Sequence, residues 1–157
     1  MSNPDWPAPD VTPQPVRYAS FGMRALGHIC DGLMVAIIIV PLSIVLAIAT
    51  GQDQGNSTIA SMTSILGLII QSYWIGTKGG SPLRVKIGVI VVDETTGAYI
   101  GFSRGLLRTV VTNAFGLLAV FNLVLGLVPL IDFLWMLRDP RNQTLHDKVA
   151  RTIVQQS

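Results

Sequence analysis

Two long apolar segments dominate the first half of the chain, and each is long enough to cross a membrane as a helix. The first covers about residues 25–50 and includes the run LMVAIIIVPLSIVLAIA. The second covers about residues 58–76 and ends near Tyr73 and Trp74, aromatic residues that favour the membrane–water interface. A hydrocarbon core about 30 Å thick needs roughly 20 residues of helix. The pattern therefore predicts an α-helical integral membrane protein with at least two transmembrane helices.

A third apolar region covers residues 106–137, but polar residues and turn formers interrupt it. Asn122, Gly126 and Pro129 lie near its middle, where they could break a helix. The whole region is short for two full crossings of about 20 residues each. Two alternatives stay open from the sequence: a single crossing, or a broken hairpin that folds back.

The polar stretch between the second and third apolar regions has a β pattern. Residues 85–92 are rich in valine and isoleucine, residues 93–97 are typical of a turn, and residues 98–100 could form a second strand. A small β-hairpin is therefore expected at about residues 85–101. An isolated two-stranded hairpin is marginally stable in water. We expect the apolar pair Ile153-Val154 to add a strand to it.

The remaining segments lie at the two ends of the chain. Residues 1–16 carry five of the nine prolines, which disfavour helices and sheet ladders and predict a disordered tail. That tail is either a solvated tether or a docking segment for a cytoplasmic partner. Residues 17–154 are expected to form one membrane domain, followed by a short tail at residues 155–157.

The distribution of basic residues predicts the orientation in the membrane. The loop at residues 51–57 has no lysine or arginine, whereas the N-terminal and middle polar stretches do. The positive-inside rule therefore predicts a cytoplasmic N-terminus and middle stretch in a bacterial cytoplasmic membrane. Four basic residues also follow the third apolar region, and strand pairing with the hairpin requires the same side. We expect a cytoplasmic C-terminus and a multi-pass protein.

Composition narrows the possible functions. Hydrophobic residues make up 50% of the chain and charged residues 13%, well below the roughly 25% charged residues of ordinary soluble domains. The net charge of +2 and the lack of a basic run argue against nucleic acid. Cys30 is the single cysteine, so no intramolecular disulfide or cysteine metal cluster can form. No catalytic triad, metal-ligand cluster or phosphate-binding loop is evident, so we expect no enzyme, no cofactor and no metal.

The chain resembles the RDD family of small bacterial multi-pass membrane proteins, named for one arginine and two aspartates. The similarity covers about residues 18–154 and lies in stretches that occur in the family's order and spacing. These stretches are YASFGMR at residues 18–24 before Asp31-Gly32, KIGVIVVD at residues 86–93, RGLLR at residues 104–108, and QTLHDKVARTIV at residues 143–154.

The resemblance also implies which residues matter. The family's arginine corresponds to Arg24 and its first aspartate to Asp31, while Asp147 is the second aspartate and Asp132 a competing position. The proline-rich start and the DFLW stretch resemble actinobacterial, proline-rich antigen-like members. The sequence departs from the family at residues 81–84, SPLR. The resemblance implies a role in transport of unidentified ligands.

Arg24, His28 and Asp31 form the first candidate site, because their spacing places them on one face of a helix. Two turns separate Arg24 from Asp31, about 10 Å along the axis, so direct contact is not expected, although His28 could bridge them. One interpretation is an ion or proton site in which Asp31 changes protonation and His28 relays the proton. The alternative is a structural ion pair between Asp31 and Arg104 or Arg108.

The other ionisable residues have competing interpretations. Asp132 is either a partner for the first-helix face or an interfacial residue satisfied by water. Asp147 has the spacing of a helix cap and is expected to cap and to pair with charge. His146 is expected at the surface. Arg104 and Arg108 are expected at the cytoplasmic border, where their partner is either a phospholipid phosphate or Asp31.

The sequence therefore supports two functional hypotheses. The first is transport or binding of an unidentified small ligand or ion, with the lipid bilayer as surroundings and a homo-oligomer expected because so few helices offer little surface for a pathway. The second is a non-transporting accessory or scaffold protein that regulates a membrane partner through its tail and β element. Loss of residues 1–16 should affect only the second.

Overall fold

The computed structural model describes residues 16–53, 55–121 and 127–156, and the side chains of residues 115–121 are not described. The predicted tail therefore lies outside the described residues except for Val16, as does the predicted helix break at residues 122–126. The elements in chain order are α1 (Phe21–Thr50), α2 (Ser57–Lys78), α3 (Pro82–Lys86), β1 (Val89–Asp93), α4 (Gly101–Phe121), α5 (Leu127–Trp135), α6 (Leu145–Ala150) and β2 (Thr152–Gln156).

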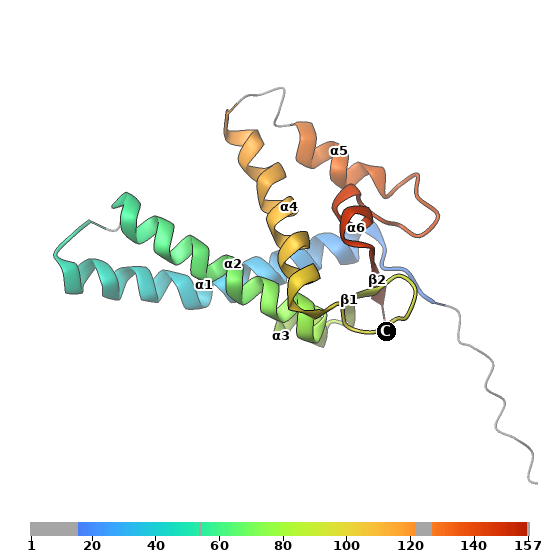
Figure 1. Ribbon diagram of the computed structural model, residues 1–157, viewed down its shortest axis with the longest axis horizontal. Helices are drawn as coiled ribbons and strands as arrows, with labels where there is room; N and C mark the ends of the chain where they lie inside the picture. The colour runs from blue at the N-terminus through green and yellow to red at the C-terminus, as the bar shows by residue number, and fades with distance from the viewer. Residues whose placement is uncertain (1–15, 54, 122–126, 157) are drawn as a thin grey trace, which may run out of the picture.

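Helices α1 and α2 form a long hairpin (Figure 1) and confirm the two predicted transmembrane helices. The Ser20 side chain accepts a hydrogen bond from the Met23 N–H and caps the start of α1, four residues earlier than expected. Gly51, with φ of 66°, ends α1 in the left-handed conformation that favours glycine. Gly67 of α2 lies so close to α1 that an added Cβ would be 3.2 Å from a Val35 methyl.

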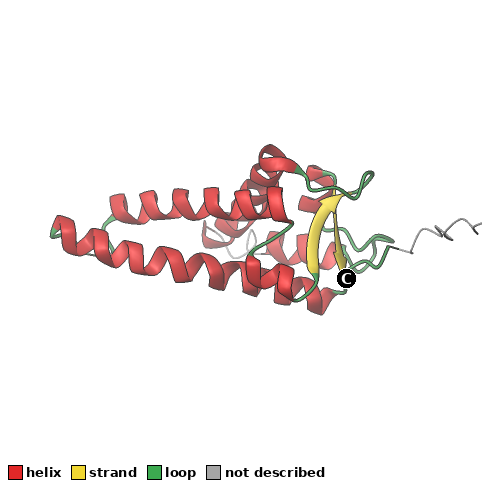
Figure 2. Ribbon diagram, turned by 90° about the horizontal axis from the view of Figure 1, so that it is seen from below, coloured by secondary structure: helices red, strands yellow, loops and turns green. Residues whose placement is uncertain are grey.

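The hairpin has two unlike parts. Residues 32–66, which we call the arm, expose apolar side chains such as Leu33, Ile37 and Ile48. The other end, which we call the head, contains residues 17–31 of the chain together with α3, α6, the sheet and the adjoining parts of α4 and α5 (Figure 2). Apolar surface without protein neighbours is expected where lipid is the solvent.

The third apolar region forms two helices, α4 and α5, and α5 contacts both α4 and α6. Two glycines bring α4 against α2. A Cβ on Gly105 would lie 2.6 Å from the Ser72 carbonyl oxygen, and one on Gly76 would lie 2.5 Å from the Gly101 carbonyl oxygen. The two backbones therefore touch where any larger residue would separate them.

Strand β1 pairs antiparallel with β2, with Val91 opposite Val154. The predicted addition of the Ile153-Val154 segment is thus confirmed. Residues 17–19 lie along the other edge of β2, where the Ala19 N–H donates to the Val154 carbonyl at 2.9 Å. The sheet packs its valines on a small core with Ala19, Ile75 and Ile100. The first and last described segments of the chain are therefore neighbours.

The predicted β-hairpin at residues 85–101 is wrong. Residues 82–86 form α3, because the Ser81 hydroxyl accepts from the Arg84 N–H and proline suits the first helical position. Residues 98–100 form no strand; the Asp93 N–H donates to the Ala98 carbonyl, which closes a turn that leads into α4. The only strand paired with β1 in the described residues is β2.

Candidate functional site

Asp147 joins the two ends of the domain. It lies in the first turn of α6, where its carboxylate and the Thr144 hydroxyl form a capping box. Its side chain is fully buried and pairs with Arg24 of α1 and with Arg108 of α4, whose Nη2 lies at 2.7 Å. Burial raises the pKa of the Asp147 carboxyl, but the charges of Arg108 and Arg24 lower it more, so the pKa lies well below its usual value. Asp147 therefore both caps a helix and pairs with charge, as the sequence predicted.

Asp31 of α1 is held by α3. Its Oδ2 lies 2.6 Å from Arg84 Nη1, and its Oδ1 accepts from the Ser81 N–H at 3.0 Å. The Arg84 guanidinium is fully buried and also donates from Nε to the Val89 carbonyl. The ion-pair interpretation of Asp31 therefore holds, but Arg104 and Arg108 are the wrong partners.

Glycine makes room for this pair. A Cβ on Gly27 would lie 3.1 Å from Arg84 Nε, and one on Gly80 would lie 2.6 Å from Arg84 Cδ. Sequence reasoning missed Arg84, although the SPLR segment at residues 81–84 was noted as a departure from the family. The Ser-Pro pair at residues 81–82 could have indicated it, because it is typical of a capped helix start, and Arg84 follows Pro82 by two residues.

Asp132 of α5 pairs with His146 of α6. Its Oδ2 lies 2.6 Å from His146 Nδ1, and its Oδ1 accepts from the His146 N–H at 3.0 Å. Both side chains are buried, so the prediction of a surface histidine is wrong. Asp132 therefore pairs with an imidazole of α6, and not with the first-helix face of Arg24, His28 and Asp31.

His28 does not bridge Arg24 and Asp31. Its ring lies with its centroid 6.2 Å from the Phe133 ring and 6.2 Å from the His146 ring, both edge-on. Among the described residues, no hydrogen bond joins His28 to Arg24 or to Asp31. The three residues of the predicted α1 face therefore contact three different elements instead of one another.

Arg104 fastens the sheet to α4. It pairs with Asp93 at the end of β1 and donates to the carbonyls of Ala150 and Arg151. Hydrogen bonds from the Thr95 hydroxyl and from Arg104 hold the pKa of the Asp93 carboxyl below its usual value. Arg104 thus has protein partners, and it keeps about a third of its side chain exposed.

The charges of the buried cluster balance. We use this name for a set of buried side chains together with the half-buried His28 beside them; the buried members are Arg24, Arg84, Arg108, Asp31, Asp132, Asp147 and His146. Its three guanidiniums and three carboxylates are equal in number, so the net charge is zero when both imidazoles are neutral. Taking charges out of water costs several kcal/mol per ion, and only close pairing with further hydrogen bonds offsets that cost. Three buried donors, Arg24 Nε and Nη2 and Arg84 Nη2, have no hydrogen-bond partner within the described part of the chain.

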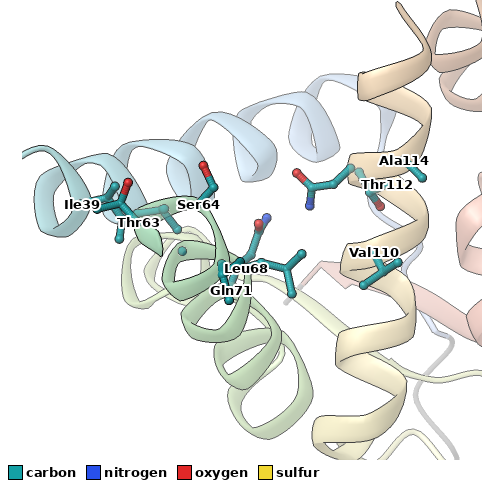
Figure 3. A pocket seen from close by; sticks show the side chains of 12 residues that line it. Ile39, Thr63, Ser64, Leu68, Gln71, Val110, Thr112 and Ala114 are labelled. Carbon is teal, nitrogen blue, oxygen red and sulfur yellow. The ribbon is translucent and has the colours of Figure 1, made fainter. Parts of the chain in front are cut away.

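A groove of about 830 Å³ lies between the hairpin and α4 (Figure 3). Its walls are mostly apolar and include Val35 of α1, Leu68 of α2 and Val110 of α4, with the amides of Gln71 and Asn113 among them. The Asn113 amide donates to the Thr109 carbonyl of its own helix at 2.7 Å. No group of three or more histidine, cysteine, aspartate or glutamate side chains arranged for a metal occurs among the residues that the structure describes.

The comparison with known proteins identifies one family. The sequence model of the RDD family matches residues 18–151, most of the chain. The matched stretch contains every residue of the buried cluster. No curated protein and no solved structure matches the chain.

Proposed function

Because the chain belongs to the RDD family, whose members are membrane proteins, we propose that it binds and moves a small ion across the membrane and that the buried cluster is its ion-linked site. The observation that carries this proposal is the burial of three arginines, three aspartates and a histidine at the head of an apolar hairpin. Ionisable side chains among membrane-spanning helices are costly and mark ion or proton pathways more often than not.

Stability alone gives little reason for such a cluster. Replacing a buried ion pair by apolar side chains of similar volume is often neutral or stabilising, whereas removing one partner is strongly destabilising. The contacts of Asp147 and of the Asp132–His146 pair join α1, α4, α5 and α6, and the Asp31–Arg84 pair joins α1 to α3. That arrangement suits a protein that changes shape as it binds and releases an ion.

The proposed topology places both ends of the domain on the cytoplasmic side. Residues 17–19, β1 and β2 are joined by backbone hydrogen bonds, which require a common side of the membrane. Helices α1 and α2 then cross out and back, and α4 and α5 must also begin and end on that side. The broken hairpin is therefore the alternative that we propose for the third apolar region, within a bacterial cytoplasmic membrane.

Flux measurements with the purified full chain in proteoliposomes test the proposal. We expect flux under imposed pH and cation gradients, and loss of that flux in Asp31→Asn if the variant still elutes as a folded species. The matched control is Asp53→Asn, which removes the same charge from the exposed loop at the tip of the arm. Absence of flux from folded wild-type protein under every gradient would overturn the proposal.

The rival proposal is an accessory or scaffold protein that regulates a membrane partner. Its support is the small sheet, whose strand β2 is hydrogen-bonded to residues 17–19, the residues that follow the proline-rich segment in the sequence. Deletion of residues 1–16 separates the two proposals, because it leaves the hydrogen bond from the Gln156 N–H to the Arg17 carbonyl intact. A transporter keeps its flux after this deletion, whereas an accessory protein loses its partner. Non-enzymatic function stays a prediction.

Transport by so small a chain is proposed to need more than one copy. The described helices leave the apolar face of the arm without protein neighbours, and the groove beside α4 opens along it. Crosslinking in native membranes, followed by mass measurement of the extracted species, tests for a homo-oligomer. A species that stays monomeric while it transports would contradict this part.

A further inference from the structure

We infer that the Asp132–His146 pair is the group at which the buried cluster takes up and releases a proton. The inference rests on the proposed function only for the use made of that proton. The site itself is argued from the partners of the three buried carboxylates, which differ in one respect. Two of the carboxylates face arginines, and the third faces an imidazole.

Asp147 and Asp31 both pair with partners of fixed charge. Asp147 faces two guanidiniums, those of Arg24 and Arg108, and Asp31 faces Arg84 and also accepts a backbone N–H. Arginine keeps its charge at any physiological pH, so each of these carboxylates faces a positive charge that does not change. Protonating either one would leave a buried guanidinium without its counter-charge, which is strongly unfavourable.

Asp132 has a partner that can change its charge. Imidazole is the side chain whose ordinary titration falls between pH 5 and 8. In this pair the Asp132 carboxylate contacts His146 Nδ1 at 2.6 Å, and the backbone N–H of the same residue fixes the other oxygen. A proton shared across that contact can be lost or gained while every arginine of the cluster keeps its carboxylate.

The charged and titratable groups around His146 come from four elements. From α1 the ring faces His28, at 6.2 Å between centroids, and the Arg24 charge beyond Asp147. From α4 the facing charge is Arg108, from α5 it is Asp132, and within α6 it is Asp147, whose Oδ1 lies 3.7 Å from His146 Nε2. Strand β2, which packs on α6, has no titratable side chain.

Protonation of the pair would therefore act on Asp147. The ring of His146 lies between the Asp132 and Asp147 carboxylates, and a charged ring competes with Arg24 and Arg108 for the second of them. The cluster is neutral with both imidazoles neutral, so uptake of one proton leaves it with one positive charge. Release of a cation or binding of an anion would restore the balance, which links the proton to the moved ion.

Nitrogen-15 NMR of the full chain in lipid nanodiscs tests the inference without any flux. The chain has two histidines, so histidine labelling gives the nitrogen signals of two imidazole rings, and His28→Gln assigns them. Spectra are recorded from pH 5 to 8, and the inference requires the His146 signal to change across that range. In Asp132→Asn the midpoint of this change should move down, because the neighbouring negative charge is gone. Asp53→Asn should leave the midpoint unchanged.

Two results would overturn the inference: a His146 signal that stays constant across that pH range, or an equal midpoint in wild type and Asp132→Asn. Should Asp132→Asn fail to fold, proton counting decides with His146→Gln, which should bind about one proton fewer per chain between pH 8 and 5. Titration of the pair in a chain that shows no flux would instead contradict the proposed function and leave the proton site standing.

Discussion

Helix α1 runs through both the head and the arm, and the kind of side chain that it buries differs between the two. Within α1, the segment up to Asp31 buries Arg24 and Asp31 to 2% exposure, whereas Ile37 and Ile48 beyond it are 64% and 77% exposed. Charged residues are thus inside and apolar residues outside, the reverse of a soluble domain. The arm depends on lipid for its surroundings, and the head depends on the pairing of buried charges. Equivalent substitutions should therefore have unequal effects in the two parts.

The largest difference is expected for one aspartate in each part. Asp147→Asn removes the counter-charge of Arg24 and Arg108 and should lower the free energy of unfolding by about 3–5 kcal/mol, the usual cost of breaking a buried pair. Asp53→Asn, on the exposed loop of the arm, should change it by less than about 0.5 kcal/mol. Chemical unfolding in detergent measures the free energy of unfolding of both variants. Equal losses would contradict the difference proposed between arm and head.

The second prediction concerns two glycines. Gly105→Ala places a methyl group against the α2 backbone at Ser72 and should cost about 1–3 kcal/mol, because a backbone cannot move aside as a side chain can. Gly32→Ala meets nothing within 4 Å and should be neutral or slightly stabilising. Thermal unfolding midpoints of the two variants test this directly. A Gly105→Ala protein as stable as wild type would show that α2 and α4 are not in backbone contact.

The third prediction concerns how the free energy of unfolding falls at acid pH. The pKa of Asp147 is lowered on folding, so its contribution is fully present above the unfolded value of about 3.9 and is lost as pH falls toward the folded value. Wild-type stability should therefore decline below about pH 4, by at most about 1.4 kcal/mol per pH unit for this one proton. Asp147→Asn should lack this part of the decline. A matching decline in both proteins would assign it to other carboxylates.

The smallest effect is expected on the arm. Ile37→Ala removes an apolar side chain that has lipid or detergent around it, so the free energy of unfolding should change by less than about 0.5 kcal/mol. Ile153→Ala, in the buried face of β2, should cost about 2–5 kcal/mol by contrast. Denaturant titration of both variants compares them. A loss above 1 kcal/mol for Ile37→Ala would indicate that the arm packs against protein.

The sequence predicts the parts of the fold whose cause is local. The two long helices follow from continuous apolar length, and the pairing of the Ile153-Val154 segment follows from strand propensity and the need of β1 for a partner. The capping box at Asp147 could also be read from its spacing. The helices and the capping box depend on residues close together in the sequence, and the strand pairing depends on the local strand propensity of each segment.

Two features that the sequence did not predict depend on contacts between residues far apart in the chain. Asp31 and Arg84 are 53 positions apart, and they meet because Gly27 and Gly80 leave space for the guanidinium. His146 follows a polar segment that is typical of a surface, and it is buried because α5 returns to cover α6. The hairpin error has a local origin instead: a valine-rich stretch fits a strand, but the Ser81 cap begins a helix in front of it.

Proton movement in proteoliposomes tests the central claim, that the head carries a proton-linked ion site, most directly. A pH-sensitive dye inside the vesicles would report proton movement driven by a cation gradient for wild type, Asp132→Asn and Asp53→Asn, each reconstituted as folded protein. The account predicts movement by wild type and Asp53→Asn, and a rate at least about tenfold lower for Asp132→Asn, whose pair can no longer share a proton. Equal rates for all three proteins, or no movement by any, would contradict it.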